Sequence, residues 1–158
     1  MGEQKKTKDD DIRVISENRK ARHTYAIEES LEAGLVLFGS EVKSLRAGTA
    51  NLADAYAAPK GKELFLLNAR IGPYNPASLF GHEPTRARKI LMHRKELDRW
   101  LTKVKERGLS IIPLMLYFKD GKAKVQLGLA KGKTHEDRRA GIKERETKRE
   151  MDRAMRRR

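Results

Sequence analysis

The segment over residues 109–129 constrains the fold most strongly, because it has the pattern of one long β-hairpin. Residues 109–118 are almost all apolar, and the Asp120-Gly121 dipeptide that follows is typical of a two-residue hairpin turn. Beyond the turn, apolar side chains alternate with polar or small ones at Val125, Leu127 and Leu129. This alternation is typical of a strand with one buried face. The segment therefore predicts an antiparallel sheet.

The other apolar runs are short and are separated by turn residues. We expect further strands over residues 25–28 continuing through 34–39, over 54–57 and over 63–67, and a short helix over 40–48. The clearest helix runs from Arg94 to Arg107, since apolar residues recur there at helical spacing and Gly108 can end the helix. Trp100 lies on that apolar face and is expected in the core.

Five or six short strands joined by tight turns favour a mainly β fold with accessory helices. We expect a small antiparallel β-barrel of the OB type rather than a parallel α/β sheet. A chain of 158 residues can bury one modest core. The predicted division is a flexible N-terminus over residues 1–17, the barrel over residues 18–130 and a basic tail over residues 131–158.

The charge of the chain predicts a polyanionic partner, with nucleic acid first. The sequence holds 36 Lys and Arg against 22 Asp and Glu, a net charge of +14. Residues 131–158 alone hold 12 cations and six carboxylates, and they have too few apolar side chains to pack. We expect this tail to be disordered when free and able to become helical on a partner. Charge alone leaves an inert, solubilising tail equally open.

Several classes of site and location are excluded by composition. The absence of Cys removes thiolate chemistry and Cys-based metal sites. The histidines lie far apart at positions 23, 82, 93 and 135, so no metal-ligand spacing appears and no cofactor or metal is expected. No apolar run approaches the roughly 18 residues of a membrane helix, and the start of the chain has no secretory pattern. A monomeric cytoplasmic protein without a membrane partner is therefore expected.

Two enzymatic readings are weaker than a binding role. Residues 128–134 resemble a phosphate-binding P-loop, but only three residues separate the glycines where four are needed. A ribonuclease could pair His23 or His135 with Glu32 or Glu136 for acid–base cleavage, yet no spacing fixes such a pair. We therefore expect no enzymatic activity.

Two basic segments have the composition of RNA-binding surfaces. The first, residues 18–25, sets cations beside rings that can stack on bases: Arg19, Lys20, Arg22, His23 and Tyr25. A basic linker with Tyr25 in the core is an equally good interpretation. The second segment, residues 84–92, places cations before an apolar strand in which Leu91 would face outward, toward a base or ribose. A core position is the commoner fate of a leucine.

These segments carry a resemblance to one family. The motifs are Asn18-x-x-Ala-x-His-x-Tyr25, the segments over residues 32–35, 39–48 and 51–56, Pro84-Thr-Arg-x-Arg-Lys-x-Leu91, the segment over residues 127–133, and Asp137-Arg-Arg139 with residues 142–146. Together they resemble the SsrA-binding protein (SmpB) family from about Asn18 to Arg145. The family usually has Asp-Lys-Arg where this chain has Asp137-Arg138-Arg139, and charge is kept.

The resemblance implies a function that composition does not. It implies an OB-type barrel that binds transfer-messenger RNA and delivers it to the A site of a stalled bacterial ribosome for trans-translation. It also implies a tail that becomes helical in the messenger channel and contacts the decoding centre. A structural ribosomal protein and, less well supported, a ribonuclease remain the alternatives.

The resemblance also assigns residues to each partner. Contacts to the tRNA-like domain of the RNA would come from Asn18, Glu32 and Leu91. Phosphate contacts would come from Lys43, Arg46, Arg86, Arg88 and Lys89. Ribosome contacts would come from the tail, through Lys131, Lys133, His135, Asp137, Arg138, Arg139, Lys143 and Arg145.

Overall fold

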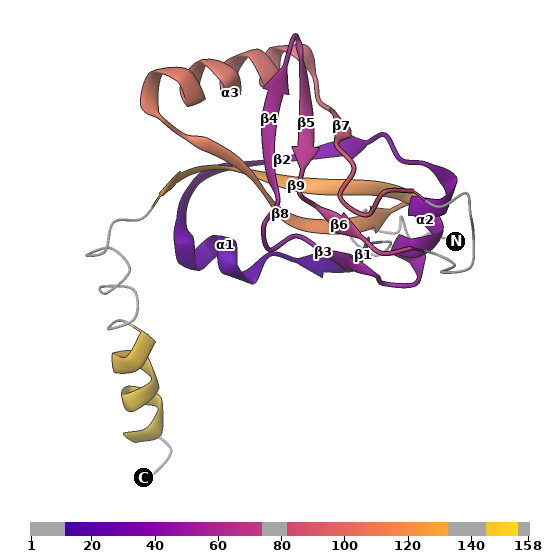
Figure 1. Ribbon diagram of the computed structural model, residues 1–158. Coiled ribbons are helices and arrows are strands. Elements are labelled where there is room, and N and C mark those ends of the chain that lie inside the picture. Colours follow the sequence, from indigo (N-terminus) through magenta and orange to yellow (C-terminus); the bar gives the residue numbers. More distant parts are fainter. Residues whose placement is uncertain (1–11, 74–81, 133–144, 155–158) are drawn as a thin grey trace, which may run out of the picture.

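The computed structural model describes residues 12–73, 82–132 and 145–154 of the chain (Figure 1). The strands are β1 (Ile12–Glu17), β2 (Tyr25–Leu35), β3 (Ala50–Asn51), β4 (Tyr56–Lys60), β5 (Glu63–Leu67), β6 (Arg70–Ile71), β7 (Arg88–Leu91), β8 (Ser110–Lys119) and β9 (Lys122–Gly132). The helices of the body are α1 (Arg19–Thr24), α2 (Gly39–Arg46) and α3 (Arg94–Arg107).

Six strands pair into a closed ring. The order is β8-β4-β5-β7-β2-β9, and β9 pairs again with β8; all of these pairings are antiparallel. The predicted mainly β fold with accessory helices is confirmed, and the ring is consistent with the OB type. The two-residue strands β3 and β6, which were not predicted, form a small second sheet.

The predicted hairpin is present in full. Strands β8 and β9 pair from Ser110 opposite Ala130 to Lys119 opposite Lys122. Asp120 and Gly121 form the turn with φ angles of 52° and 77°, the left-handed conformation that a tight hairpin turn with the right twist needs. The register shifts by one residue between Pro113 and Met115, which relieves the ladder where proline cannot donate.

The predicted boundaries of the barrel need correction at both ends. Residues 12–17 are not part of a flexible terminus, because they form β1 and pair with the second half of β8. Apolar residues of this strand, such as Val14 at 51% exposure, are not buried. The strand therefore lacks the apolar pattern by which a sequence reveals a half-buried strand. At the other end, β9 continues through Lys131 to Gly132, two residues beyond the predicted end of the barrel.

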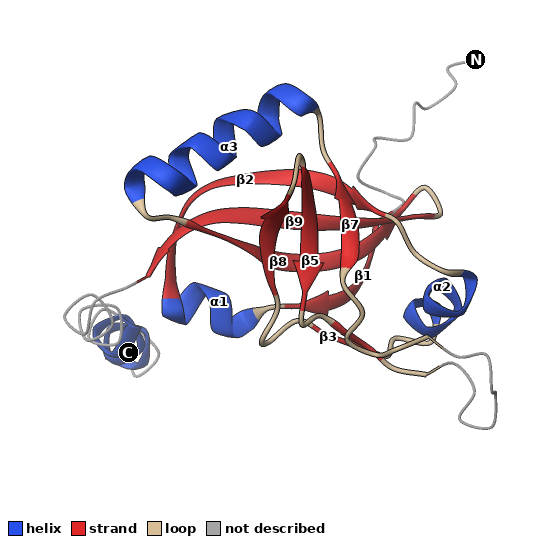
Figure 2. Cartoon of the chain, turned by 45° about the horizontal axis from the view of Figure 1, so that its top comes forward, coloured by secondary structure: helices blue, strands red, loops and turns tan. Residues whose placement is uncertain are grey.

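Helix α3 lies across one side of the ring, where Figure 2 shows it spanning strand β2. It runs from Arg94 to Arg107, as predicted, and ends at Gly108 with a φ of 64°. Trp100 is fully buried, in a core shared with leucines of the strands and of α2. Its interpretation as a core residue is confirmed.

Ion pairs tie the polar side of α3 to β2. Arg99 and Lys103 contact the carboxylate of Glu29 at 2.6 and 3.2 Å, and Arg107 contacts Glu28 at 2.9 Å. The hydrogen bond from Arg99 lowers the pKa of Glu29 from its ordinary 4.5 to about 2. Because folding favours the ionised form of Glu29, the contacts of Arg99 and Lys103 stabilise the docked helix only while Glu29 is charged.

We predict that the Glu29→Gln variant is less stable than the wild-type protein at pH 6 and that the difference shrinks on acidification. The pKa of Glu29 is depressed on folding, so its contribution is complete above pH 4.5 and is lost as the pH falls toward 2. Chemical unfolding followed by the fluorescence of Trp100 would measure this. Glu106→Gln, an exposed carboxylate of the same helix, is the control. A difference in stability that does not change with pH would contradict the prediction.

Candidate nucleic-acid interface

Asn18 builds helix α1 rather than the molecular surface. Its side-chain oxygen accepts a hydrogen bond from the N–H of Ala21, which caps the helix. Its amide nitrogen donates to the carbonyl oxygens of Leu52 and Pro113 at 3.2 and 2.9 Å. The residue is 6% exposed. The side chain is buried with its hydrogen bonds used, so it holds the basic helix in place, and its assignment as a direct RNA contact stays a prediction.

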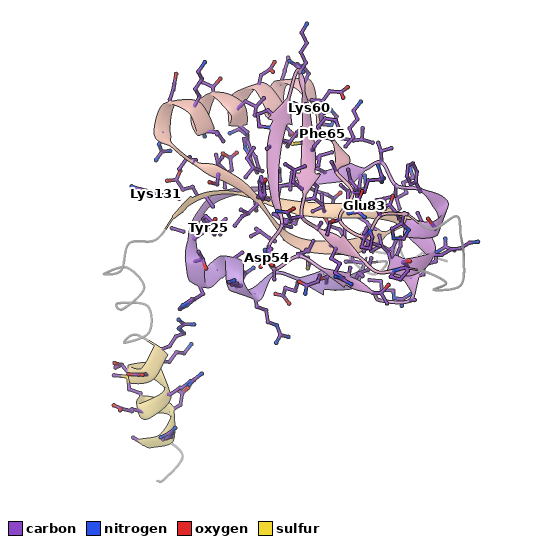
Figure 3. The ribbon with its side chains drawn as sticks, in the orientation of Figure 1. Tyr25, Asp54, Lys60, Phe65, Glu83 and Lys131 are labelled. Carbon is purple, nitrogen blue, oxygen red and sulfur yellow. The ribbon has the colours of Figure 1, made fainter. Side chains whose placement is uncertain are left out.

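The remaining predicted residues of the first basic segment surround one end of the ring. Arg19, Lys20, Arg22 and His23 are exposed on α1. Tyr25 is half-buried and lines a cavity of about 260 Å³, together with Lys20 and Tyr56. Lys131 of β9 lies opposite Ala26 of β2, so it lies at the same end of the ring as α1. Figure 3 shows Tyr25 and Lys131 near each other there.

A larger cavity, of about 540 Å³, brings together three predicted residues from two neighbouring strands. Glu32 of β2 and Lys89 and Leu91 of β7 line it. Leu91 is 50% exposed whereas its neighbour Ile90 is 3% exposed, which confirms the predicted outward orientation of Leu91. Lys89 also forms an ion pair of 2.7 Å with Glu63.

Arg88 and Arg86 meet at a buried carboxylate. Arg88 is fully buried; it donates to Glu41, and also to the carbonyl oxygens of Ala69 at 2.7 Å and Pro84 at 3.1 Å. Arg86 contacts the other oxygen of Glu41 at 2.5 Å and stacks on Phe38 at 3.9 Å. Arg88 has no exposed side-chain surface, so its role in this structure is to pair with Glu41, and its assignment as a phosphate contact stays a prediction.

The environment of Glu41 keeps this carboxylate ionised. Burial by itself raises its pKa, but the N–H of Phe38 and the two guanidinium groups outweigh burial and hold the pKa of Glu41 below its ordinary value. Burial also lowers the pKa of the Arg88 guanidinium, against the attraction of Glu41. Glu41 thus fixes α2 to the start of β7. Its bond to the N–H of Phe38, at 2.9 Å, starts the helix there rather than at Ser40.

The predicted phosphate-binding residues therefore divide into separate places. Lys43 and Arg46 are exposed on α2, and Arg86 keeps 25% of its side chain exposed. Helices α1 and α2 lie at opposite ends of the ring in Figures 1 and 2. Exposed cations are thus present at the α1 end, at the large cavity and at α2.

The tail is described only in part. Residues 145–154 form a helix in which every residue is exposed, and Arg145 begins it. The predicted disorder of the free tail remains a prediction. The other predicted tail contacts lie outside the described residues: Lys133, His135, Asp137, Arg138, Arg139 and Lys143.

A protein-family model described as SmpB protein matches residues 15–157. The chain belongs to the SmpB family. An SsrA-binding protein of Myxococcus xanthus is 72% identical over 147 residues, which cover 93% of this chain and 91% of that protein. An SsrA-binding protein of Symbiobacterium thermophilum is 56% identical over 147 residues, covering 92% and 93%. The family resemblance of the motifs is confirmed.

A solved structure gives the same result for the fold of this SmpB-family chain. The structure is described as "tmRNA-SmpB: a journey to the center of the bacterial ribosome". One of its chains is 46% identical, with a TM-score of 0.65, and the match covers 80% of this chain and 93% of that chain.

Three cations that line the large cavity of this SmpB-family chain were not predicted from the sequence. Lys62 comes from the β4–β5 turn, Arg94 from the start of α3 and Lys124 from β9. For Lys124 a signal was present, since it alternates with the buried Val125 and must face outward. No local pattern indicates that Lys62 and Arg94 approach β2, because the contact depends on the packing of α3.

The described part of this SmpB-family chain gives no support to the ribonuclease pair of His23 and Glu32. His23 lies on α1, before the first residue of β2, and Glu32 lies seven residues beyond that first residue, roughly 20 Å along the strand. Glu136 and His135 lie outside the described residues. The described residues contain no group of three or more His, Asp or Glu that could hold a metal ion. No helix among them is long and apolar enough to cross a membrane.

We predict that Glu41→Gln destabilises the protein by about 3–5 kcal/mol, because the change leaves the buried Arg88 without its counter-charge. Chemical unfolding at neutral pH measures this. The matched control is Asp98→Asn, which breaks the exposed pair with Arg94 at 3.2 Å and should cost less than about 0.5 kcal/mol. Equal losses in the two variants would show that Glu41 does not neutralise a buried cation.

Proposed function

We propose that this protein binds transfer-messenger RNA and delivers it to the A site of stalled bacterial ribosomes for trans-translation. It acts in the cytoplasm as a monomeric, non-enzymatic RNA-binding protein. The observation that carries the proposal is the SmpB match over residues 15–157, together with SsrA-binding proteins that share up to 72% of residues with this chain. The similar solved structure, whose description names tmRNA, SmpB and the ribosome, supports both partners.

The large cavity has the chemistry to recognise a structured RNA. Glu32 cannot bind phosphate, but its carboxylate can accept hydrogen bonds from a base edge or a ribose hydroxyl. Leu91 offers an exposed apolar surface to a base or ribose. The four cations of the rim can neutralise phosphates on either side: Lys62, Lys89, Arg94 and Lys124. A site with this composition distinguishes one RNA surface from generic polyanions.

The α1 end and the tail supply a second set of contacts. Lys20 lines the same cavity as Tyr25, and the other exposed cations of α1 lie at this end of the ring with Lys131. The cations can bind phosphates, and the Tyr25 ring can stack on a base. The tail continues from this end of β9 with a net charge of +6 over residues 131–158. We assign the α1 end and the large cavity to transfer-messenger RNA and the tail to the ribosome.

The decisive experiment is to capture the protein from cells and sequence the RNA that comes with it. We expect one dominant RNA with a tRNA-like domain, together with ribosomal RNA that a high-salt wash removes. Recovery of bulk ribosomal RNA that survives the wash would instead indicate a structural ribosomal protein. Shortening of a labelled RNA by the purified protein would indicate a nuclease.

We predict that Glu32→Ala weakens binding to the tRNA-like domain about tenfold and leaves the fold intact. Such a loss corresponds to one hydrogen bond to a charged group, about 1.4 kcal/mol. Binding titrations at fixed salt measure it. Glu28→Ala is the matched control, since it removes an exposed carboxylate of the same strand that lies outside the cavity. An unchanged affinity of Glu32→Ala would remove Glu32 from the interface.

We also predict that deletion of residues 134–158 leaves the affinity for transfer-messenger RNA within about twofold of wild type and abolishes tagging on stalled ribosomes. The cavity and α1 lie outside the deleted segment, and the tail should become ordered only on its partner. Reconstituted translation on a message without a stop codon measures tagging. Loss of RNA binding by the deletion would refute the proposed division of labour.

A further inference from the structure

Tyr117 of β8 holds the carboxylate of Glu32. The phenol donates a hydrogen bond to Oε2 of Glu32, and Lys119 Nζ contacts the same oxygen at 3.3 Å. Within the described part of the chain, Oε1 of Glu32 has no hydrogen-bond partner. Glu32 lines the large cavity, whereas Tyr117 is 4% exposed and does not line it. Tyr117 therefore lies behind the group that faces the ligand.

The strand register makes this contact possible. Tyr117 lies opposite Lys124 on β9, and Lys124 lies opposite Gly34 on β2, two residues from Glu32. Tyr117 and Glu32 thus stand on the outer face of the ring, two strand spacings apart and offset by two residues, which is about 12 Å at the backbone. A long phenol and a glutamate can bridge that distance across β9.

Gly34 contributes to the same arrangement. It lies opposite Leu91 on β7, and a Cβ added at Gly34 would lie 3.4 Å from the Cβ of Leu91. The side chain of Leu91 therefore lies over Gly34 of β2, two residues along the strand from Glu32. The apolar surface and the carboxylate are therefore held next to each other by the register of β2 with its two neighbours.

The protonation states of Tyr117 and Glu32 make the phenol the donor and the carboxylate the acceptor. Burial and the nearby Glu32 raise the pKa of Tyr117, so that the phenol stays protonated. The hydrogen bond from Tyr117, aided by Lys119 and Lys124, lowers the pKa of Glu32, so that the carboxylate stays ionised. At neutral pH the phenol always donates and the carboxylate always accepts.

We propose that Tyr117 is a positioning residue of the RNA site, which fixes Glu32 by Oε2 and leaves Oε1 as a single acceptor in the cavity. The inference rests on the proposed function. A single acceptor fits one donor, such as the amino or imino group of an unpaired base or a ribose hydroxyl, placed beside the apolar surface of Leu91. A freely rotating carboxylate would lose part of its binding energy to ordering.

The test is a double-mutant cycle on binding to the isolated tRNA-like domain. Tyr117→Phe keeps the ring and removes only the hydroxyl, and it should weaken binding about fivefold through the loss of one hydrogen bond's positioning effect. In the Glu32→Ala background the same change should have no effect, because there is no carboxylate to position. An equal loss in both backgrounds would show a merely structural role and overturn the proposal.

A second measurement needs no RNA. The carboxyl carbon of Glu32, followed by NMR, should titrate below the ordinary glutamate pKa in the wild-type protein and closer to it in Tyr117→Phe. Other charged or titratable groups face Glu32 or share its cavity, and the interpretation of the Glu32 titration must take their charge into account: Lys62, Glu63, Lys89, His93, Arg94, Lys119 and Lys124. An ordinary pKa of Glu32 in the wild-type protein would overturn the proposal even if Tyr117→Phe does not fold.

The two measurements separate this inference from the function on which it rests. Failure of the wild-type protein to bind the tRNA-like domain would refute the proposed function, while a low pKa of Glu32 that rises in Tyr117→Phe would still establish the Tyr117 contact. Wild-type binding that Glu32→Ala weakens and Tyr117→Phe leaves unchanged would refute the role of Tyr117 alone.

Discussion

Strand β9 has hydrogen-bonded partners along both of its edges, and the rest of the structure depends on this double pairing. It pairs with β2 from Gly34 opposite Lys124 to Tyr25 opposite Gly132, and with β8 over nearly the same length. The pairing closes the ring, turns Val125, Leu127 and Leu129 into the core, and turns the alternate residues outward. It also sets the distance that Tyr117 spans to reach Glu32, so one register determines both the core and the recognition surface.

Burial divides the basic residues into two classes that carry the same formal charge. Arg88 is enclosed with Glu41 and stabilises the junction of α2 and β7, while Lys89 and Lys124 line the large cavity. A buried guanidinium has given up its water and needs a carboxylate, so it has no capacity left for a phosphate. The net charge of +14 thus overstates the number of cations available to RNA.

The sequence predicted those elements whose signals are local. The β8–β9 hairpin, α3 with its glycine stop and the outward Leu91 all follow from turn chemistry and periodicity. Strand β1 was missed because it is an outer strand with exposed apolar residues and draws its order from β8. Asn18 and Arg88 were assigned to RNA through the family resemblance of the motifs that contain them. Their burial depends on segments more than 15 residues away, such as Pro113 for Asn18 and Ala69 for Arg88.

The sequence by itself determined the mainly β class, the hairpin, the excess of positive charge and, through its motifs, the SmpB family. Turn residues, alternation and motif strings are properties of neighbouring positions, so they can be read without coordinates. Only the tertiary structure decided which charges are free, which strands share the large cavity and how Tyr117 reaches Glu32. Those facts depend on strand register and burial, which arise when distant segments pair and exclude water.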